Sequence, residues 1–261
     1  ITPKFAGVIK PDGVGWHHRG VYTVAYTGEA YEMASVATYL VRETDHAPAS
    51  WALDNLAHAL RSEFEMSHDR AMPDATRGRM PANQRLAPGR AEWYAMCVPF
   101  AFLAMADPAH ETEMGGLFAR LWDPTCPDHE PALRMNLFKV PWCKATVGRR
   151  GLLEQFADHR APEPAGPRCG LYVKPWAGLA VARSERWLAA IKGYSQYVWD
   201  FECHPRSWHP KEQNVYGRYI SNGTIQVLAS TQSNVPTRLG TDLKNGWDWT
   251  RWPGATAKQS G

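Results

Sequence analysis

The first half of the chain repeats apolar residues at the three- and four-residue spacing of α-helices. Four such stretches, separated by polar loops, predict four helices. Ser50 is expected to cap the second helix and Pro99 to kink the third. The third helix is expected at about 91–106. The apolar positions that mark the other three are Ala30, Met33, Ala34, Ala37 and Val41 in the first, Leu53, Leu56, Ala57, Leu60 and Phe64 in the second, and Met114, Leu117, Phe118 and Leu121 in the fourth.

From about residue 166 the pattern changes to short β-type runs between Pro and Gly residues. These runs lie at 171–174, 179–183, 187–202 and 217–229 and predict an antiparallel sheet. In the third run, one parity holds Trp187, Ile191, Tyr197, Trp199 and Phe201, and the other holds Lys192, Gln196, Asp200 and Glu202. Alternate residues of a strand point to opposite faces, so we expect the aromatic parity to face a core and Glu202 to project from the polar side.

The pattern therefore predicts an α+β protein of two parts, a helical domain at 1–165 and a sheet domain at 166–261. Antiparallel helix pairs joined by loops fit either part of an α/α toroid or a helix bundle. The 261 residues are enough for one large or two modest domains. No apolar run is long enough to span a membrane, and the chain is expected to be an internal fragment of a longer polypeptide.

Composition narrows the range of partners and cofactors. The net charge is only +3, which gives no broad positive field of the kind that attracts nucleic acid. Arginines gather locally at Arg77, Arg79, Arg85 and Arg90, either as a solvated loop or as a surface for an acidic substrate. The five cysteines show no metal-ligand spacing, and Cys203, His204 and His209 lack a fourth partner. We therefore expect no metal site.

The segment 12–31 carries the most chemistry. It reads D-G-V-G-W-H-H-R-G-V-Y-T-V-A-Y-T-G-E-A-Y and holds two histidines and three tyrosines. Imidazole and phenol groups can move protons to and from a carbon acid, whereas a hydrolase more often needs paired carboxylates or a Ser or Cys nucleophile. Four further segments follow: G-R-M-P at 78–81, V-W-D-F-E at 198–202, N-V-Y-G-R-Y at 214–219 and G-W-D-W-T-R-W-P-G-A-T at 246–256.

These five segments, in this order, resemble the polysaccharide lyase family that contains the chondroitin and hyaluronan lyases, and most of all its chondroitin ABC lyase branch. The resemblance begins at K-P-D-G, residues 10–13. It implies an incomplete α/α toroid followed by the start of an antiparallel β-sandwich. It also implies a secreted or periplasmic monomer that cleaves uronic-acid-containing glycosaminoglycans by β-elimination, without a cofactor.

The resemblance also assigns catalytic roles. His18 falls on the catalytic histidine, Tyr26 on the catalytic tyrosine, Arg79 on the active-site arginine and Glu202 on the glutamate of the β domain. Tyr26 would act as base and acid on glucuronate, and His18 as base on the iduronate epimer. Arg79 would neutralise the uronate carboxylate, and Glu202 would hold Arg79. The site is expected in a cleft between the two halves.

Several assignments stay open at this point. The spacing of His18 and Tyr26 leaves Tyr22 and Tyr31 as alternative bases. Trp16, His17 and Asn222 are candidates for substrate binding, with His17 standing where the ABC branch has a basic residue. The alternative functions are a related toroid lyase acting on heparan-type chains or alginate, and a non-catalytic glycan-binding protein with the same fold.

Overall fold

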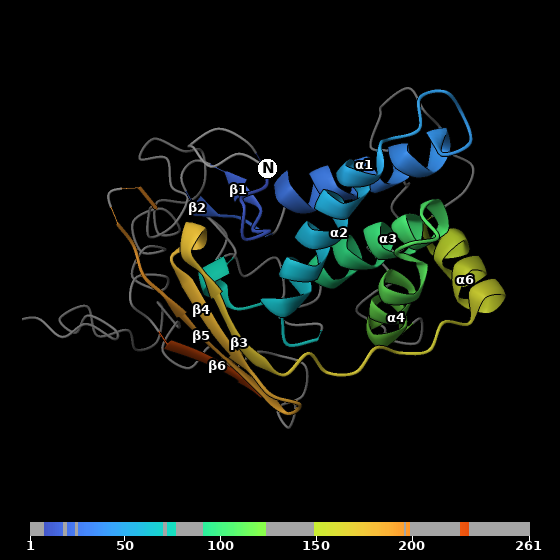
Figure 1. The fold of residues 1–261 in the computed structure, drawn as a ribbon. Helices are drawn as coiled ribbons and strands as arrows, with labels where there is room; N and C mark the ends of the chain where they lie inside the picture. The colour runs from blue at the N-terminus through green and yellow to red at the C-terminus, as the bar shows by residue number, and fades with distance from the viewer. Residues whose placement is uncertain are drawn as a thin grey trace, which may run out of the picture.

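Helices gather at one side of the molecule and a four-stranded sheet at the other (Figure 1). The computed structural model describes residues 8–17, 20–23, 26–69, 72–76, 91–123, 149–195, 197–198 and 225–229. Within this part of the chain, no helix has both the length and the apolar character needed to cross a membrane. The helices are α1 (Tyr26–Val41), α2 (Ser50–Glu65), α3 (Ala91–Ala106), α4 (Glu111–Leu121) and α6 (Arg149–Arg160), with 3₁₀ turns η1 (Asp74–Thr76) and η3 (Pro175–Ala177).

Helix α3 is the centre of the helical half because it is apolar on every side. It runs through Pro99, and the side chains from Met96 to Ala104 that point toward its neighbours are buried. Helices α1 and α4 pack on it. The predicted faces of α2 and α4 are confirmed, because Leu56, Ala57, Leu60, Phe64, Met114, Leu117, Phe118 and Leu121 all lie in this core. The predicted cap is wrong by one residue, since α2 begins at Ser50 and Ala49 occupies the N-cap position.

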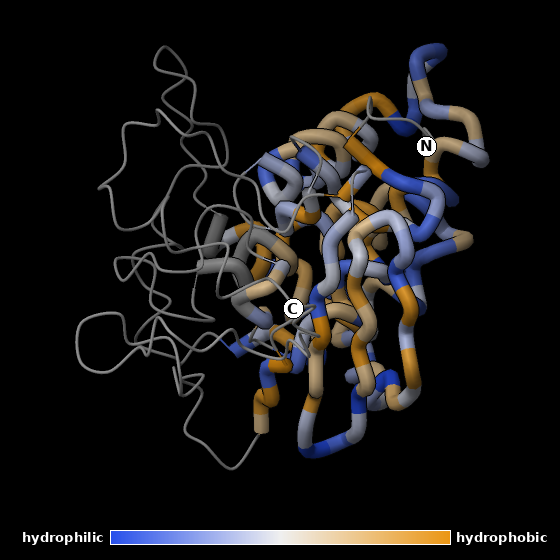
Figure 2. The backbone as a smooth tube through the Cα atoms, turned by 90° about the vertical axis from the view of Figure 1, so that its left-hand side faces the viewer, coloured by the Kyte–Doolittle hydropathy of each residue, from blue (hydrophilic) through white to orange (hydrophobic). Residues whose placement is uncertain are grey.

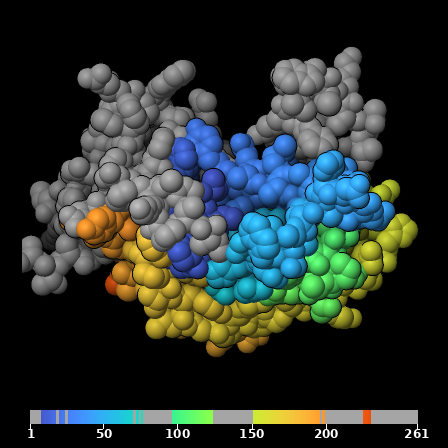
Figure 3. Space-filling view, turned by 45° about the horizontal axis from the view of Figure 1, so that its top comes forward, coloured from blue at the N-terminus to red at the C-terminus, as the bar shows by residue number. Residues whose placement is uncertain are grey.

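Helix α1 forms where the sequence predicts it but presents the opposite face to the core. The predicted core stripe points outward, and Met33 is 53% exposed. The face turned toward α3 is small and polar instead, with Thr27, Gly28, Tyr31, Glu32, Ser35, Val36 and Thr38 buried. Small residues let two helices approach closely, and α3 supplies the apolar surface for both. Figure 3 shows α1, in blue, on the surface of the molecule.

The sheet is a meander of four antiparallel strands. They are β3 (Gly170–Lys174), β4 (Leu179–Arg183), β5 (Trp187–Lys192) and β6 (Ile225–Ala229), in the order β3-β4-β5-β6. The described strands of the second half therefore form an antiparallel sheet, as predicted. The predicted strand at 187–202 ends at Lys192, and of the run 217–229 only β6 lies within the described residues.

The two faces of this sheet differ in composition. The inner face packs on Val14, Val21 and Met66 of the helical half. On the outer face, every residue of the four described strands is apolar by the strand register, and hydrophobic positions recur along the strands in Figure 2. The strand register places Lys174, Leu179, Val181, Arg183, Leu188, Ala190, Lys192 and Leu228 on the inner face, and Leu171, Val173, Ala180, Ala182, Trp187, Ala189, Ile191, Ile225, Val227 and Ala229 on the outer face.

The predicted parity of β5 is wrong. Its buried side chains are Leu188, Ala190 and Lys192, while Trp187 and Ile191 are exposed. A lysine tolerates the inner face because its ammonium group donates to the carbonyl of Gly193 at 3.0 Å while its alkyl stem packs among apolar neighbours. Glu202, whose direction was predicted from the same parity, lies outside the described residues.

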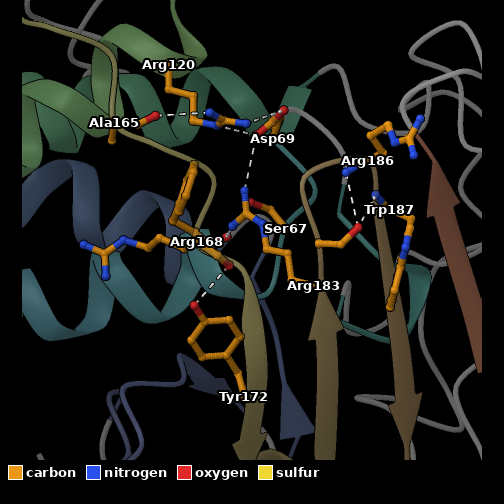
Figure 4. Close-up of polar contacts among 11 residues, drawn as sticks. Ser67, Asp69, Arg120, Ala165, Arg168, Tyr172, Arg183, Arg186 and Trp187 are labelled. Atoms are coloured by element: carbon orange, nitrogen blue, oxygen red, sulfur yellow. Dashed lines mark hydrogen bonds and ion pairs between the residues drawn. The ribbon is translucent and has the colours of Figure 1, made fainter.

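A partly buried ionic cluster connects β4 to the helices (Figure 4). Asp69, just after α2, accepts from Arg120 of α4 at 2.7 Å and from Arg183 of β4 at 3.2 Å. Arg183 also donates to the carbonyl of Phe64 at 2.7 Å, and its guanidinium lies 4.3 Å from the centroid of that ring. The cluster joins α2, α4 and the sheet in one contact network.

Candidate active site

A short hairpin brings the histidine segment against the start of α1. Strand β1 (Trp16–His17) pairs antiparallel with β2 (Gly20–Val21), and the amide of Tyr22 donates to the carbonyl of Gly15 at 3.2 Å. A Cβ atom on Gly15 would lie 1.9 Å from Cγ2 of Thr27. Only glycine therefore allows the hairpin to lie this close to the first turn of α1.

The hairpin and the helix together form an aromatic cluster of His17, Tyr22 and Tyr26. The imidazole of His17 and the ring of Tyr26 have centroids 4.5 Å apart, and the ring of Tyr22 lies 5.5 Å from that of Tyr26, edge to face. The His17 and Tyr22 centroids are 6.0 Å apart. An imidazole and a phenol in contact place two groups capable of proton transfer at one point of the structure.

Exposure separates the three tyrosines that the sequence offers as a base. Tyr26 is 48% exposed, whereas Tyr22 is 0% and Tyr31 is 2% exposed. Burial raises the pKa of Tyr31 well above 10, and the nearby Glu63 and Asp12 raise that pKa further. A phenol in such surroundings resists ionisation and cannot reach a polymer in solvent. Of the three, only Tyr26 is placed to meet a substrate.

Trp16 faces the interior and not the solvent. Its side chain is only 4% exposed, and the ammonium group of the buried Lys10 lies 3.8 Å from its ring centroid. This geometry is a cation–π contact in a desolvated place, which strengthens the attraction. Burial also lowers the pKa of Lys10, against the opposing effect of the Asp12 carboxylate. Trp16 thus anchors the hairpin that carries His17.

Other predicted site residues lie outside the described part of the chain. They are His18, Arg79, Glu202 and Asn222, and their convergence with Tyr26 stays a prediction. Sequence reasoning passed over Lys10, which lies over the ring of Trp16, and Asp12 and Glu63, which lie near Tyr31. The only signal for the first two was their position in the K-P-D-G segment. Among the described residues, no group of three or more His, Cys, Asp or Glu side chains is arranged to hold a metal ion.

Comparison with known proteins gives related sequences over nearly the whole chain. Residues 1–121 match the family model described as "Lyase, catalytic". The chain is 27% identical over 264 residues to the chondroitin sulfate ABC exolyase of Bacteroides thetaiotaomicron, an alignment that covers 98% of this chain and 24% of that relative. The chain therefore spans about a quarter of the length of this curated relative.

Solved structures share the fold. A Paenibacillus xanthan lyase matches with a TM-score of 0.66 and 13% identity, over 87% of this chain and 20% of that one. The Streptomyces coelicolor A3 chondroitin AC lyase in complex with chondroitin sulphate matches with a TM-score of 0.60 and 18% identity, over 88% of this chain and 30% of that one. The chain is thus similar to a lyase catalytic domain over residues 1–121, to a chondroitin sulfate ABC exolyase in sequence, and to xanthan and chondroitin AC lyases in fold.

Proposed function

We propose that the protein is a lyase that cleaves chondroitin sulfate, dermatan sulfate and hyaluronan by β-elimination. The observation that carries the proposal is the contact between His17 and the exposed Tyr26, whose ring centroids lie 4.5 Å apart. The substrate class is supported by a relative named as a chondroitin sulfate ABC exolyase and by a structural neighbour described in complex with chondroitin sulphate.

The proposed reaction begins at C5 of the uronate, whose proton is weakly acidic because it adjoins a carboxyl group. Tyr26 removes this proton, a C4=C5 double bond forms, and the C4–O glycosidic bond breaks. The departing oxygen takes up a proton, and Tyr26 supplies it when the uronate is glucuronate. No water is added and no electrons are gained or lost overall. The reaction thus needs only acid, base and charge neutralisation.

A cation must lie near Tyr26 for this chemistry. A phenol has an ordinary pKa of about 10, so a positive neighbour is needed to favour the phenolate near neutral pH. We assign that role to Arg79, which would also neutralise the uronate carboxylate, and assign Glu202 to the orientation of Arg79. Asn222 is proposed to line the same cleft. These three roles come from the family resemblance.

The histidine of the pair needs a separate decision. The resemblance pointed to His18, but the described contact with Tyr26 is made by His17. Iduronate presents its C5 proton on the ring face opposite to that of glucuronate, so a second base is needed for dermatan-type chains. We propose that His17 or His18 supplies it, with His17 favoured by its position against Tyr26.

Replacing Tyr26 by Phe tests the function directly. The variant keeps the ring in contact with His17 and loses only the hydroxyl, so turnover should fall by about 10²-fold or more while folding is retained. Tyr22→Phe and Tyr31→Phe are the matched controls and should keep most of the activity. The readout is the ultraviolet absorbance of the unsaturated uronate. Products without this absorbance, or binding without cleavage, would remove the lyase assignment.

The two histidines are separated by a second assay. His17→Ala and His18→Ala are compared on dermatan sulfate and on chondroitin sulfate lacking iduronate. The true second base should show a loss on dermatan sulfate at least about tenfold larger than on the other substrate. Equal losses for both variants on both substrates would assign neither histidine as the iduronate base.

We propose further that the described halves are parts of an incomplete α/α toroid and of a β-sandwich, divided near residue 165. Two apolar surfaces support this. One is the outer stripe of α1, where Met33 and Leu40 are exposed, and the other is the outer face of the sheet. A further helix would cover the first surface, and a second sheet would cover the second at the usual spacing of about 10 Å.

We also propose that the protein acts as a monomer, without a metal or cofactor, in the periplasm or outside the cell. The substrate supports the location, because a long acidic polysaccharide does not cross a lipid bilayer unaided. Cell fractionation with an antibody against the chain tests this location. Accumulation of the mature protein in the cytoplasm would contradict it.

A further inference from the structure

The segment 8–17, which ends at His17, is a tight hairpin pressed onto α2. The amide of Trp16 donates to the carbonyl of Val8 at 2.7 Å, and the amide of Lys10 donates to the carbonyl of Val14 at 2.9 Å. At its tip, Gly13 has a φ of +78°, and a Cβ atom there would lie 2.7 Å from Cβ of Ser62. The tip therefore packs so closely against α2 that no side chain can be accommodated at residue 13.

Asp12 at this tip joins the hairpin to both halves of the molecule. Its carboxylate accepts from the amide of Trp176 at 2.9 Å and from the amide of Val14 at 3.3 Å. Its backbone carbonyl accepts from the hydroxyl of Ser62 at 3.1 Å and from the ammonium group of Lys174 at 3.2 Å. Trp176 and Lys174 belong to the sheet half, and Ser62 belongs to α2. One residue thus contacts a helix, the sheet and the hairpin itself.

The ammonium groups of two lysines, Lys174 and Lys10, also contact this region. The ammonium group of Lys174 is buried and also donates to Glu65 of α2 at 2.7 Å. That of Lys10 lies 3.8 Å from the ring centroid of Trp16 and 6.0 Å from that of Trp176. Lys10 therefore sits between one tryptophan of the hairpin and one of the sheet half, next to the Asp12 contact. Movement of the sheet half relative to α2 would disturb both the position of Lys10 between the two tryptophans and the contacts of Asp12.

We propose that Asp12 is a positioning residue that sets His17 against Tyr26 according to how the sheet half sits on the helical half. The chain of contacts runs from Trp176 and Lys174 through Asp12 to the hairpin, and the hairpin ends at His17. The kinetic part of this proposal rests on the proposed lyase function. A shift of about 1 Å in a catalytic group can cost about 10²-fold in rate, so a loosened hairpin should slow turnover without removing a substrate contact.

The test compares Asp12→Ala and Asp12→Asn with Asp45→Asn, a control at an exposed position, all in the intact protein. The positional readout is the NMR signal of the His17 Cε1 proton, which the ring current of Tyr26 displaces and which His17→Ala identifies by its loss. Asp12→Ala should move this signal toward that of an unstructured histidine. It should also lower kcat about tenfold or more with little change in KM. Asp12→Asn keeps one oxygen for the Trp176 amide and should show smaller changes in the same direction.

An unchanged His17 signal in folded Asp12→Ala would overturn the proposal, as would changes of equal size in Asp45→Asn. If Asp12→Ala does not fold, Asp12→Asn decides by the same signal. The two proposals can fail separately. A displaced His17 signal in a protein that never cleaves glycosaminoglycan would leave the positioning role standing and remove the lyase function.

Discussion

Helix α1 and the inner face of the sheet both bury polar side chains, but they differ in how these groups are satisfied. On the sheet, Arg183 donates to Asp69 and to the carbonyl of Phe64, and Lys174 donates to Glu65. Among the described side chains of this face, only the Nε atom of Arg183 is buried without a hydrogen-bond partner. On α1, the hydroxyls of Thr27, Tyr31 and Ser35 are buried with no hydrogen-bond partner among the described residues.

This difference indicates two uses of buried polarity. Each unsatisfied buried group costs about 1–3 kcal/mol, so folded chains keep few of them. On the sheet, this cost is offset because the polar side chains form hydrogen bonds that join the two halves. Those of α1 do not, and α1 is the helix that begins at Tyr26. Departures from good packing are expected at functional sites. We infer that the buried polar groups of α1 lower the stability of the fold, whereas those of the sheet raise it.

The largest effect is expected on the sheet. Arg183→Met keeps an apolar side chain of similar length but removes one donor to the carbonyl of Phe64, which keeps its bonds from Ser67, and one of the two arginine partners of Asp69. Loss of one member of a buried ion pair typically costs about 3 kcal/mol, so the free energy of unfolding in urea should fall by about that amount. Arg186→Met, on the same strand connection but exposed, is the control and should change it by less than about 0.5 kcal/mol. Equal losses of unfolding free energy in the two variants would contradict the stabilising role assigned to the buried polar groups of the sheet.

A smaller effect, with a pH dependence, is expected at Glu63 of α2. Burial raises the pKa of Glu63 from 4.5 to about 8 in the folded chain. Between these two values the folded chain holds a proton that the unfolded chain has lost, so stability is full below pH 4.5 and falls as the pH rises toward 8. Glu63→Gln should match the parent below about pH 4 and exceed it by roughly 2 kcal/mol near pH 6. Exposed Glu185→Gln is the control, and a parallel pH profile for Glu63→Gln would contradict this reasoning.

The next effect is expected at Tyr31, whose buried hydroxyl lacks a partner among the described residues. Tyr31→Phe removes a group that gains nothing by being buried, so stability should stay the same or rise by up to about 1 kcal/mol. The matched control is Tyr172→Phe, which removes a hydroxyl that donates to the carbonyl of Arg168 at 3.0 Å and should cost about 1 kcal/mol. Thermal unfolding of both variants measures the contrast. A large loss in Tyr31→Phe would show that this hydroxyl does have a partner.

The sequence predicted the helices better than the faces that they bury. The buried faces of α2 and α4 were predicted correctly because each helix has a single apolar stripe and packs against a single core. Helix α1 and strand β5 were assigned the wrong face because both have apolar residues on the outside, and periodicity cannot say which of two surfaces is covered first. Helix α6 was missed because its buried positions, Leu153 and Phe156, are too few to stand out in a charged segment.

The site was predictable only in part for a similar reason. The motif located the segment that holds His17 and Tyr26, but the resemblance assigned the catalytic role to His18, and spacing left Tyr22 and Tyr31 as alternatives to Tyr26. The structure places His17 against Tyr26, with ring centroids 4.5 Å apart, and pairs His17 with Gly20 in the hairpin, whereas His18 lies outside the described residues. Asp12 gave no sign of its contacts with Trp176 and Lys174, since these residues lie more than 160 positions away along the chain.

The smallest effect is expected on the outer face of the sheet. Ile191 is 47% exposed there, and threonine keeps the β-branched shape that strands favour, so Ile191→Thr should change the unfolding free energy of this chain by less than about 0.5 kcal/mol. Leu188→Thr, three residues earlier on the fully buried inner face, is the control and should cost about 3 kcal/mol, because it removes buried methyl groups and buries a hydroxyl. In the intact protein the same pair tests the proposed sandwich. A second sheet over the outer face would raise the cost at Ile191 toward that at Leu188, whereas a cost that stays below about 0.5 kcal/mol would mean that this face is open to solvent there too.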